Sequence, residues 1–201
     1  MNPDKAKNLL IKFRLPKHII AHINKVTHVA ETICDAYLIK GYKLDKNAVV
    51  CGSLLHDLMR VIDITGGAYA ELCNHSKKED IKMWDKLKKK YQNTDHSVAG
   101  CKYLNSKGER KIALIVKKHK FDAVIDPVCY PKSLEEKITT YADKRVLHNK
   151  IVSLKERFQD GEIRYNPKHE NMEIQTKIQK RYFILEKELF ENIDLKPCDI
   201  K

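Results

Sequence analysis

The sequence lacks any long apolar run. Although 42% of its 201 residues are hydrophobic, no stretch approaches the roughly 18 consecutive apolar residues that identify a membrane-spanning helix. No apolar segment follows the first residues, Met1 to Lys5, so we expect no signal peptide. These absences predict a cytoplasmic protein with no membrane partner, and its apolar content is sufficient for a substantial core.

Closely paired cysteines are also missing. The six cysteines are Cys34, Cys51, Cys73, Cys101, Cys129 and Cys198, and none belongs to a CxxC pair. Several lie within helical patterns, which is unlike a zinc ribbon or a disulfide framework. We therefore expect reduced thiols that serve mostly as small core residues.

Strand patterns, internal repeats and low-complexity tracts are absent as well. A helical pattern is present instead, because six apolar residues between positions 16 and 40 recur at alternating steps of four and three. They are Ile19, Ile23, Val26, Ala30, Ile33 and Tyr37. Pro16 suits the first position of this helix, and Gly41 suits its end. The fold class that we expect is all-α.

Other helices are expected on both sides of this one. Their approximate ranges are 4–13, 45–60, 77–91, 95–104, 109–118 and 170–192, with two more that open at the capping patterns of Ser133 and Ser153. Residues 61–75 and 120–132 are expected to form loops or broken helix. The last helix carries the stripe Ile174, Ile178, Tyr182, Leu185, Leu189 and Ile193, which predicts that it either covers the bundle or pairs with a second subunit.

The stretch 47–60 is apolar around almost its whole circumference, which is typical of a buried helix. It nevertheless contains His56 and Asp57 side by side. A buried imidazole and carboxylate are costly unless they are paired, hydrogen-bonded or bound to a metal. Adjacent helical residues point about 100° apart and pair poorly, so a cation between them is one explanation. A buried His–Asp hydrogen bond is the other.

The net charge is strongly positive. There are 39 Lys and Arg against 27 Asp and Glu, a formal charge of +12. This favours anionic partners such as nucleotides or nucleic acid. The alternative is a set of solvated lysine-rich helix faces, of which residues 86–90 are an example.

Further candidate ligands follow the His-Asp pair in the chain. In order, the series is His28, His56, Asp57, His96, His119 and Asp143. His28 lies opposite the centre of the apolar stripe and, taken alone, looks like a surface histidine, as do His18 and His22. A structure that placed His28 in solvent would contradict the metal hypothesis.

This series resembles the HD superfamily of metal-dependent phosphohydrolases, and more narrowly its HDIG-type members. The matching pieces are Val26-Thr-His28, Gly52-Ser-Leu-Leu-His-Asp57, His96-Ser-Val-Ala-Gly100, His119 and Tyr141-Ala-Asp-Lys144. Two features depart from the pattern: Leu58-Met59 replaces the Ile-Gly of the HDIG motif, and no Gly-Tyr-Pro signature of the cyclic-dinucleotide phosphodiesterases is present. The sequence is similar to the bacterial dinucleoside tetraphosphate hydrolases, which carry the same ligand series.

The resemblance implies a helical bundle with a metal centre in its middle. His28, His56, Asp57 and Asp143 would bind one metal, while His96 and His119 would add a second that Asp57 bridges. Mixed imidazole and carboxylate ligands suit Fe, Mn, Co, Ni or Zn. A metal-bound hydroxide would attack a phosphate ester or anhydride of a nucleotide or dinucleotide.

Arg60 and Lys144 are the candidates for holding the phosphate beside catalytic Asp57, the alternative being surface cations near helix ends. We expect the phosphohydrolase domain at residues 1–165 and a C-terminal extension at 166–201, which packs on the domain or forms a homodimer. The alternative to an enzyme is a metal-containing module that binds nucleotide or RNA without turnover.

Overall fold

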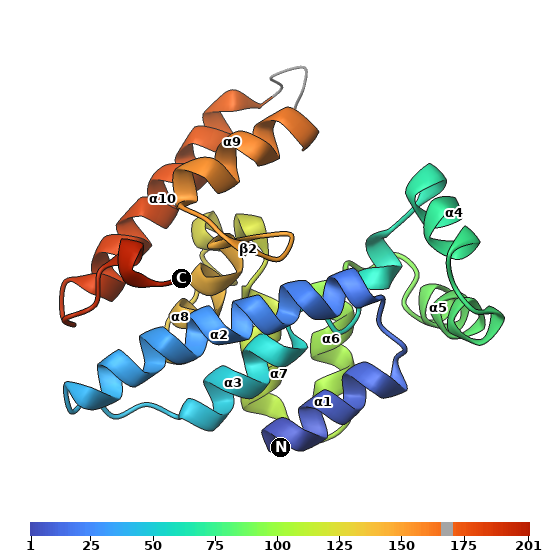
Figure 1. Cartoon of the computed structure of the whole chain (residues 1–201), viewed down its shortest axis with the longest axis horizontal. Coiled ribbons are helices and arrows are strands. Elements are labelled where there is room, and N and C mark those ends of the chain that lie inside the picture. The colour runs from blue at the N-terminus through green and yellow to red at the C-terminus, as the bar shows by residue number, and fades with distance from the viewer. Residues whose placement is uncertain (166–170) are drawn as a thin grey trace.

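The computed structural model describes residues 1–165 and 171–201, and helices account for most of this part of the chain (Figure 1). The α-helices are α1 (Pro3–Lys12), α2 (Lys17–Ile39), α3 (Lys46–Leu55), α4 (Gly66–Asn74), α5 (Lys78–Lys90), α6 (His96–Asn105), α7 (Arg110–Lys118), α8 (Leu134–Lys144), α9 (Leu154–Tyr165) and α10 (Met172–Phe190). Short 3-10 helices cover η1 (Arg60–Asp63), η2 (Phe121–Ile125) and η3 (Pro197–Asp199). The expected all-α class is confirmed.

One small β-hairpin was not expected from the sequence. Strands β1 (Val146–Leu147) and β2 (Lys150–Ile151) pair antiparallel, and His148 between them has a positive φ of 57°. Two-residue strands are too short to produce a visible alternation of apolar and polar residues. The hairpin matters for the site, because its turn lies beside the N-terminal half of α2.

Helix α2 runs along the bundle and packs against α3 and α8 (Figure 1). Its six stripe residues are all buried, as the spacing predicted. Pro16 proves to be the N-cap and the helix begins at Lys17, while Gly41 adopts a φ of +83° just after the C-cap. A left-handed glycine at this place is a common helix stop.

Helix α3 is shorter than the sequence suggested, because it ends at Leu55 and not near residue 60. His56 is its C-cap, and the chain continues through turns closed by i to i+3 hydrogen bonds, such as Leu58 N to Leu55 O at 3.1 Å, into η1. The tighter winding changes the directions of successive side chains. His56 and Asp57 can therefore face the same interior point, which adjacent residues of a regular α-helix would not do.

Two glycines allow close helix packing around α7. A Cβ on Gly52 of α3 would lie 2.5 Å from Cγ2 of Ile115, and one on Gly100 of α6 would lie 2.9 Å from Cγ1 of Val116. Both distances are too short for real carbon contacts. The two glycines therefore let α3 and α6 approach α7, which brings His56 and His96 close to His119.

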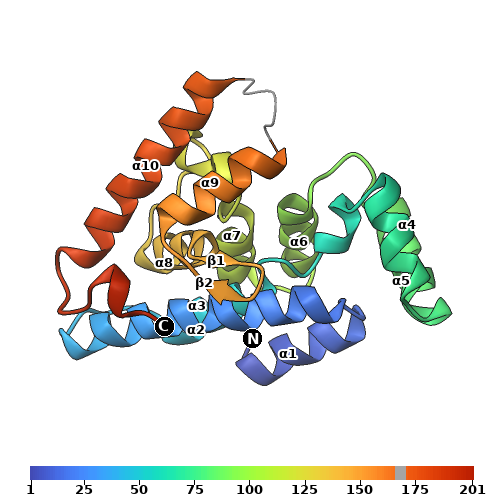
Figure 2. The ribbon, with the colours of Figure 1, turned by 45° about the horizontal axis from the view of Figure 1, so that its top comes forward.

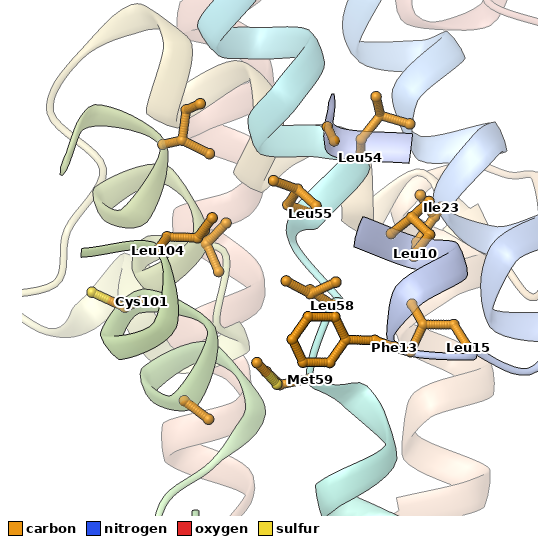
Figure 3. Close-up of a cluster of buried hydrophobic side chains, with 14 of the residues drawn as sticks. Leu10, Phe13, Leu15, Ile23, Leu54, Leu55, Leu58, Met59, Cys101 and Leu104 are labelled. Carbon is orange, nitrogen blue, oxygen red and sulfur yellow. The ribbon is translucent and has the colours of Figure 1, made fainter. Parts of the chain in front are cut away.

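The core consists of two apolar clusters. The first gathers side chains of α1, α2, α3, α5, α6 and α7, with Leu55, Leu58 and Met59 near its middle (Figure 3). The second joins the C-terminal half of α2 to α8, α9 and α10. Ile178, Tyr182, Leu185 and Leu189 of α10 are buried in it. This helix therefore covers the bundle, one of the two roles that its stripe allowed.

The stripe on α10 was not right at every position. Ile174, in the first turn of α10, is 51% exposed. Glu170, where the sequence placed the start of this helix, lies outside the described residues.

Helices α4 and α5 project from the opposite side of the bundle (Figure 2), and α4 contains no buried residue. In the described part of the chain, no helix combines the length and the apolar character that crossing a membrane would require.

Glu135 joins three helices and yields a stability prediction. Its Oε1 accepts hydrogen bonds from the backbone N of Asp45 at 3.1 Å and from Nζ of Lys111 at 3.0 Å. Burial would raise the pKa of Glu135, but its own backbone N–H and these donors outweigh it and lower the pKa to about 2. The carboxylate therefore contributes stability above the unfolded-state pKa of about 4.3, and that contribution is lost as the pH falls towards 2.

Glu135→Gln should lower the free energy of unfolding at pH 7 by about 1 kcal/mol. The difference between wild type and variant should shrink as the pH falls from about 4.3 towards 2. Urea denaturation at pH 7, about pH 4 and about pH 3 measures it, with the exposed Glu79→Gln as control. A difference that stayed constant with pH would show that the ionised carboxylate is not the source.

Candidate metal centre

Six imidazole and carboxylate side chains meet where the helices converge. Their positions are His22 on α2, His56 and Asp57 after α3, His96 at the start of α6, His119 at the end of α7 and Asp143 near the end of α8. They form two groups, His22, His56 and Asp143 in one and Asp57, His96 and His119 in the other. Within each group the ligand atoms lie within 4.8 Å of one another.

The histidine rings are oriented by hydrogen bonds to their outer nitrogen. Nδ1 of His56 lies 2.7 Å from the carbonyl of Ser53, and Nδ1 of His119 lies 2.6 Å from that of Val116. Nδ1 of His22 lies 3.0 Å from the carbonyl of His148 in the β-hairpin turn. A carbonyl only accepts, so Nδ1 must carry the proton in each ring. In the neutral rings Nε2 then presents a bare lone pair to the interior, the arrangement found in metal-binding histidines.

Asp63 of η1 orients the ring of His96, as the backbone carbonyls orient the other three rings. Its carboxylate contacts Nδ1 of His96, and its Oδ1 accepts from the backbone N of His96 at 3.1 Å. Nε2 of His96 then faces Nε2 of His119 at 3.0 Å, and Nε2 of His56 is buried without a hydrogen-bond partner. Two lone pairs at that distance repel each other unless a proton or a cation lies between them.

The carboxylate of Asp57 lies between the two groups. Its Oδ1 is 3.3 Å from Nε2 of His96 and 3.8 Å from Nε2 of His119. Its Oδ2 is 3.6 Å from Nε2 of His56 and 4.0 Å from Nε2 of His22. Each oxygen thus faces one group, which is the position that a bridging carboxylate requires.

The comparison with protein families agrees with this geometry. A family model described as the HD domain matches residues 19–146, which is more than half of the chain. The chain belongs to the HD domain family. No curated protein and no solved structure gives a match. HD domains are typically metal-dependent phosphohydrolases, and this HD domain has two buried groups of His and Asp side chains that could hold divalent metal ions.

The expectation that His28 joins the site is not met. His28 is exposed on α2, and its Nε2 lies 3.0 Å from the carbonyl of Lys201 at the C-terminus. His22, six residues earlier on the same helix, occupies the expected place, with Nε2 3.0 Å from Oδ1 of Asp143. The metal hypothesis is therefore contradicted in the form that requires His28. A revised form replaces His28 by His22, because His22 and the other five residues of the series do converge.

The helix pattern contained a signal for His22. At 100° per residue, His28 lies about 180° from the centre of the apolar stripe of α2, whereas His22 lies only about 60° from it. A histidine at the edge of a buried stripe can reach the interior, and one on the opposite face cannot. Asp63 gave no comparable signal, because its role depends on how η1 folds back against α6.

Burial and neighbouring charges shift the pKa values of the side chains in the candidate metal centre. Burial lowers the pKa of His56 to about 4, so this ring is neutral at pH 7. Burial would also lower the pKa of His22, but its hydrogen bond to Asp143 and the charges of Asp143 and Asp57 raise it. Burial would raise the pKa of Asp143, yet Lys144 and His22 hold it well below its usual range. Both carboxylates, Asp57 included, stay ionised.

The two predicted phosphate-binding cations lie beside the site. Nη1 of Arg60 is 3.3 Å from Nδ1 of His96 and 3.5 Å from Oδ2 of Asp63. Nζ of Lys144 contacts the carboxylate of Asp143 and is 5.8 Å from the ring centroid of Phe121. Arg145 instead binds the carbonyls of Val152 and Pro197, which makes it a structural residue.

A cavity of about 890 Å³ opens over these residues. Both groups contribute to its lining, as do the cations Arg60, Lys120 and Lys144. Its walls come from α2, η1 and α4 on one side and from the β-hairpin, α9 and α10 on the other. The volume is in the range of small-molecule sites, and the polar groups gather at the candidate metal centre.

His22 and His28 make a matched pair of tests on one helix. His22→Ala should lower the metal content of the purified protein, because it removes a ligand atom from the group around Asp143. His28→Ala should leave the metal content unchanged. Elemental analysis with circular dichroism as a check of folding measures both. Loss of metal in His28→Ala alone would return the ligand role to His28.

Asp63 should tune metal affinity without touching the metal. Asp63→Ala frees the His96 ring to rotate and lose its tautomer, so affinity should fall by about 10–100-fold, as for other outer partners of metal ligands. Competition with a coloured chelator measures the affinity. Asp80→Ala, which removes a surface partner of Arg14, is the control. Equal affinities in the two variants would contradict the positioning role.

Proposed function

We propose that this HD protein is a metal-dependent phosphohydrolase that cleaves a phosphate ester or anhydride of a nucleotide or dinucleotide. The observation that carries the proposal is the set of buried Nε2 atoms, oriented inward by their Nδ1 hydrogen bonds and facing each other and two ionised carboxylates. This arrangement fits divalent cations and has no evident structural use without them.

The residues suggest how metal ions would be held. His22, His56 and Asp143 would bind one ion, His96 and His119 a second, and Asp57 both. The mixture of nitrogen and oxygen donors favours Fe, Mn, Co, Ni or Zn over Mg or Ca. Bound ions of this kind activate water as a nucleophile and offset charge on phosphoryl oxygens.

The remaining polar groups would bind and orient the substrate. Arg60 and Lys144 stand on two sides of the carboxylates and would fix the oxygens of the reacting phosphoryl group. Lys144 is itself buried against Asp143, so its position is defined before substrate arrives. Such prior positioning lowers the entropy cost of the reaction.

The nucleotide assignment rests on the size and charge of the cavity. A volume of about 890 Å³ far exceeds that of a phosphate ion and leaves room for a nucleoside or a second nucleotide. The resemblance to the dinucleoside tetraphosphate hydrolases makes a dinucleotide the finer candidate. The charge of +12 supports an anionic ligand of either kind.

Metal analysis followed by a substrate panel tests the proposal. Purified protein should contain a first-row transition metal and release phosphate from at least one nucleotide or dinucleotide when that metal is supplied. Nucleotide binding without turnover under every metal condition would favour the binding module instead. Absence of both binding and turnover would contradict the nucleotide assignment.

The two groups of candidate ligands predict different losses of metal and of activity when single ligands are removed. Asp57→Ala should abolish hydrolysis and reduce metal content together, because this carboxylate faces both groups. His96→Ala should leave about one ion per chain in the group around His56, with a steep fall in turnover. Elemental analysis and initial rates measure both. Two ions retained in His96→Ala would show that this histidine is structural.

A further inference from the structure

Helices α9 and α10 lie beyond residues 19–146, which match the HD domain, yet they form a wall of its cavity. They pack against each other and stand over the bundle as a pair (Figure 2). The polar residues that α9 contributes to the wall are Arg157, Glu162 and Arg164, and those from α10 are Gln175 and Gln179. Part of the cavity wall therefore comes from helices outside the residues that match the HD domain.

Arg157 is the residue of this wall whose hydrogen bonding is incomplete. In the described part of the chain, two buried side-chain polar atoms have no hydrogen-bond partner, Nε2 of His56 and Nε of Arg157. Both residues lie at the cavity region, His56 in the metal-ligand cluster and Arg157 in the lining. A buried N–H without an acceptor costs about 1–3 kcal/mol, so the protein itself does not use the full hydrogen-bonding capacity of this guanidinium.

The charge of Arg157 is also poorly compensated. Its Nη1 lies 3.9 Å from Oδ2 of Asp160, at the limit of an ion pair. That same oxygen accepts a hydrogen bond at 2.7 Å from Nε of Arg164. Glu162 is a carboxylate in the same wall, and Asp160 is bound mainly by Arg164.

Contacts between aromatic rings connect Arg157 to the metal centre. Phe158, the next residue, has its ring centroid 6.2 Å from that of Phe121. Phe121 in turn lies 5.8 Å from Nζ of Lys144, which contacts Asp143. Lys144, Phe121 and Arg157 line one cavity, so a single extended ligand can reach both ends of this chain of contacts.

We infer that Arg157 binds a second anionic group of the substrate, beyond the phosphoryl group that reacts. The guanidinium would donate its Nη–H groups to phosphate oxygens in the paired geometry that arginine favours. This inference rests on the proposed function and specifies its substrate class, a compound with several linked phosphates. Arg157 is thus a substrate-binding residue that sets specificity, with no part in the chemical step.

The kinetic test compares substrates with one and with several phosphates. Arg157→Ala should raise KM for ATP by about tenfold or more, the loss expected for a charge-assisted hydrogen bond. It should leave kcat/KM for p-nitrophenyl phosphate unchanged. Arg157→Lys should recover part of the affinity, since lysine keeps the positive charge but lacks the paired N–H donors of a guanidinium. Lys155→Ala, an exposed change of equal charge on the same helix, is the matched control.

A binding measurement separates this inference from the proposed function. Calorimetry on the metal-loaded protein would use bis(phosphonomethyl)phosphinate, a triphosphate analogue with carbon bridges, and methylphosphonate, which has one anionic group. Arg157→Ala should weaken binding of the former by about tenfold and leave the latter unchanged. If no nucleotide or dinucleotide of the substrate panel is hydrolysed, the proposed function fails, and this binding result alone decides the role of Arg157. Equal effects on both compounds, or none on either, would overturn the inference.

Discussion

The structure depends on bringing four imidazoles and two ionised carboxylates into one buried place. In each histidine a hydrogen bond from Nδ1 offsets part of the cost of burial and directs Nε2 to the interior. Buried polar groups without partners cost free energy, so the surrounding helices must stabilise this cluster. Gly52 and Gly100 contribute by letting α3 and α6 approach α7, and the two apolar clusters on either side supply the burial.

Protons and metal ions compete for the same atoms in this arrangement. Nε2 of His22 faces Oδ1 of Asp143 at 3.0 Å, and the raised pKa of His22 means that a proton is held more firmly on this ring than on a free histidine. The proton compensates part of the charge of Asp143 and Asp57. His56 cannot do the same, because burial lowers its pKa to about 4. Metal binding should therefore release a proton from His22 and gain strength as the pH rises.

The features that the sequence made predictable are those governed by local rules. The stripe of α2 and the capping box at Ser133 follow from spacing and side-chain chemistry. Five of the six proposed ligands also lie together in the structure, and each stands at a helix end or in a buried segment. The motif points to His28, whereas the apolar stripe of α2 points to His22, which is the histidine that lies in the interior.

What local rules could not give is how distant segments meet. Asp63 becomes the partner of His96 only because a tight 3-10 path carries η1 against α6. The carbonyl of His148 reaches His22 only because a two-residue hairpin folds over α2. The role proposed for Arg157 also could not be predicted from its position in a helical pattern. It depends on the packing of α9 over the cavity. Residues that orient the proposed ligands, and the one proposed to bind a second anionic group, thus depend on tertiary packing, whereas most of the proposed ligands stand at positions that local patterns mark. If the proposal for Arg157 holds, helices outside the HD match set the substrate preference of a site whose ligands lie on the HD helices.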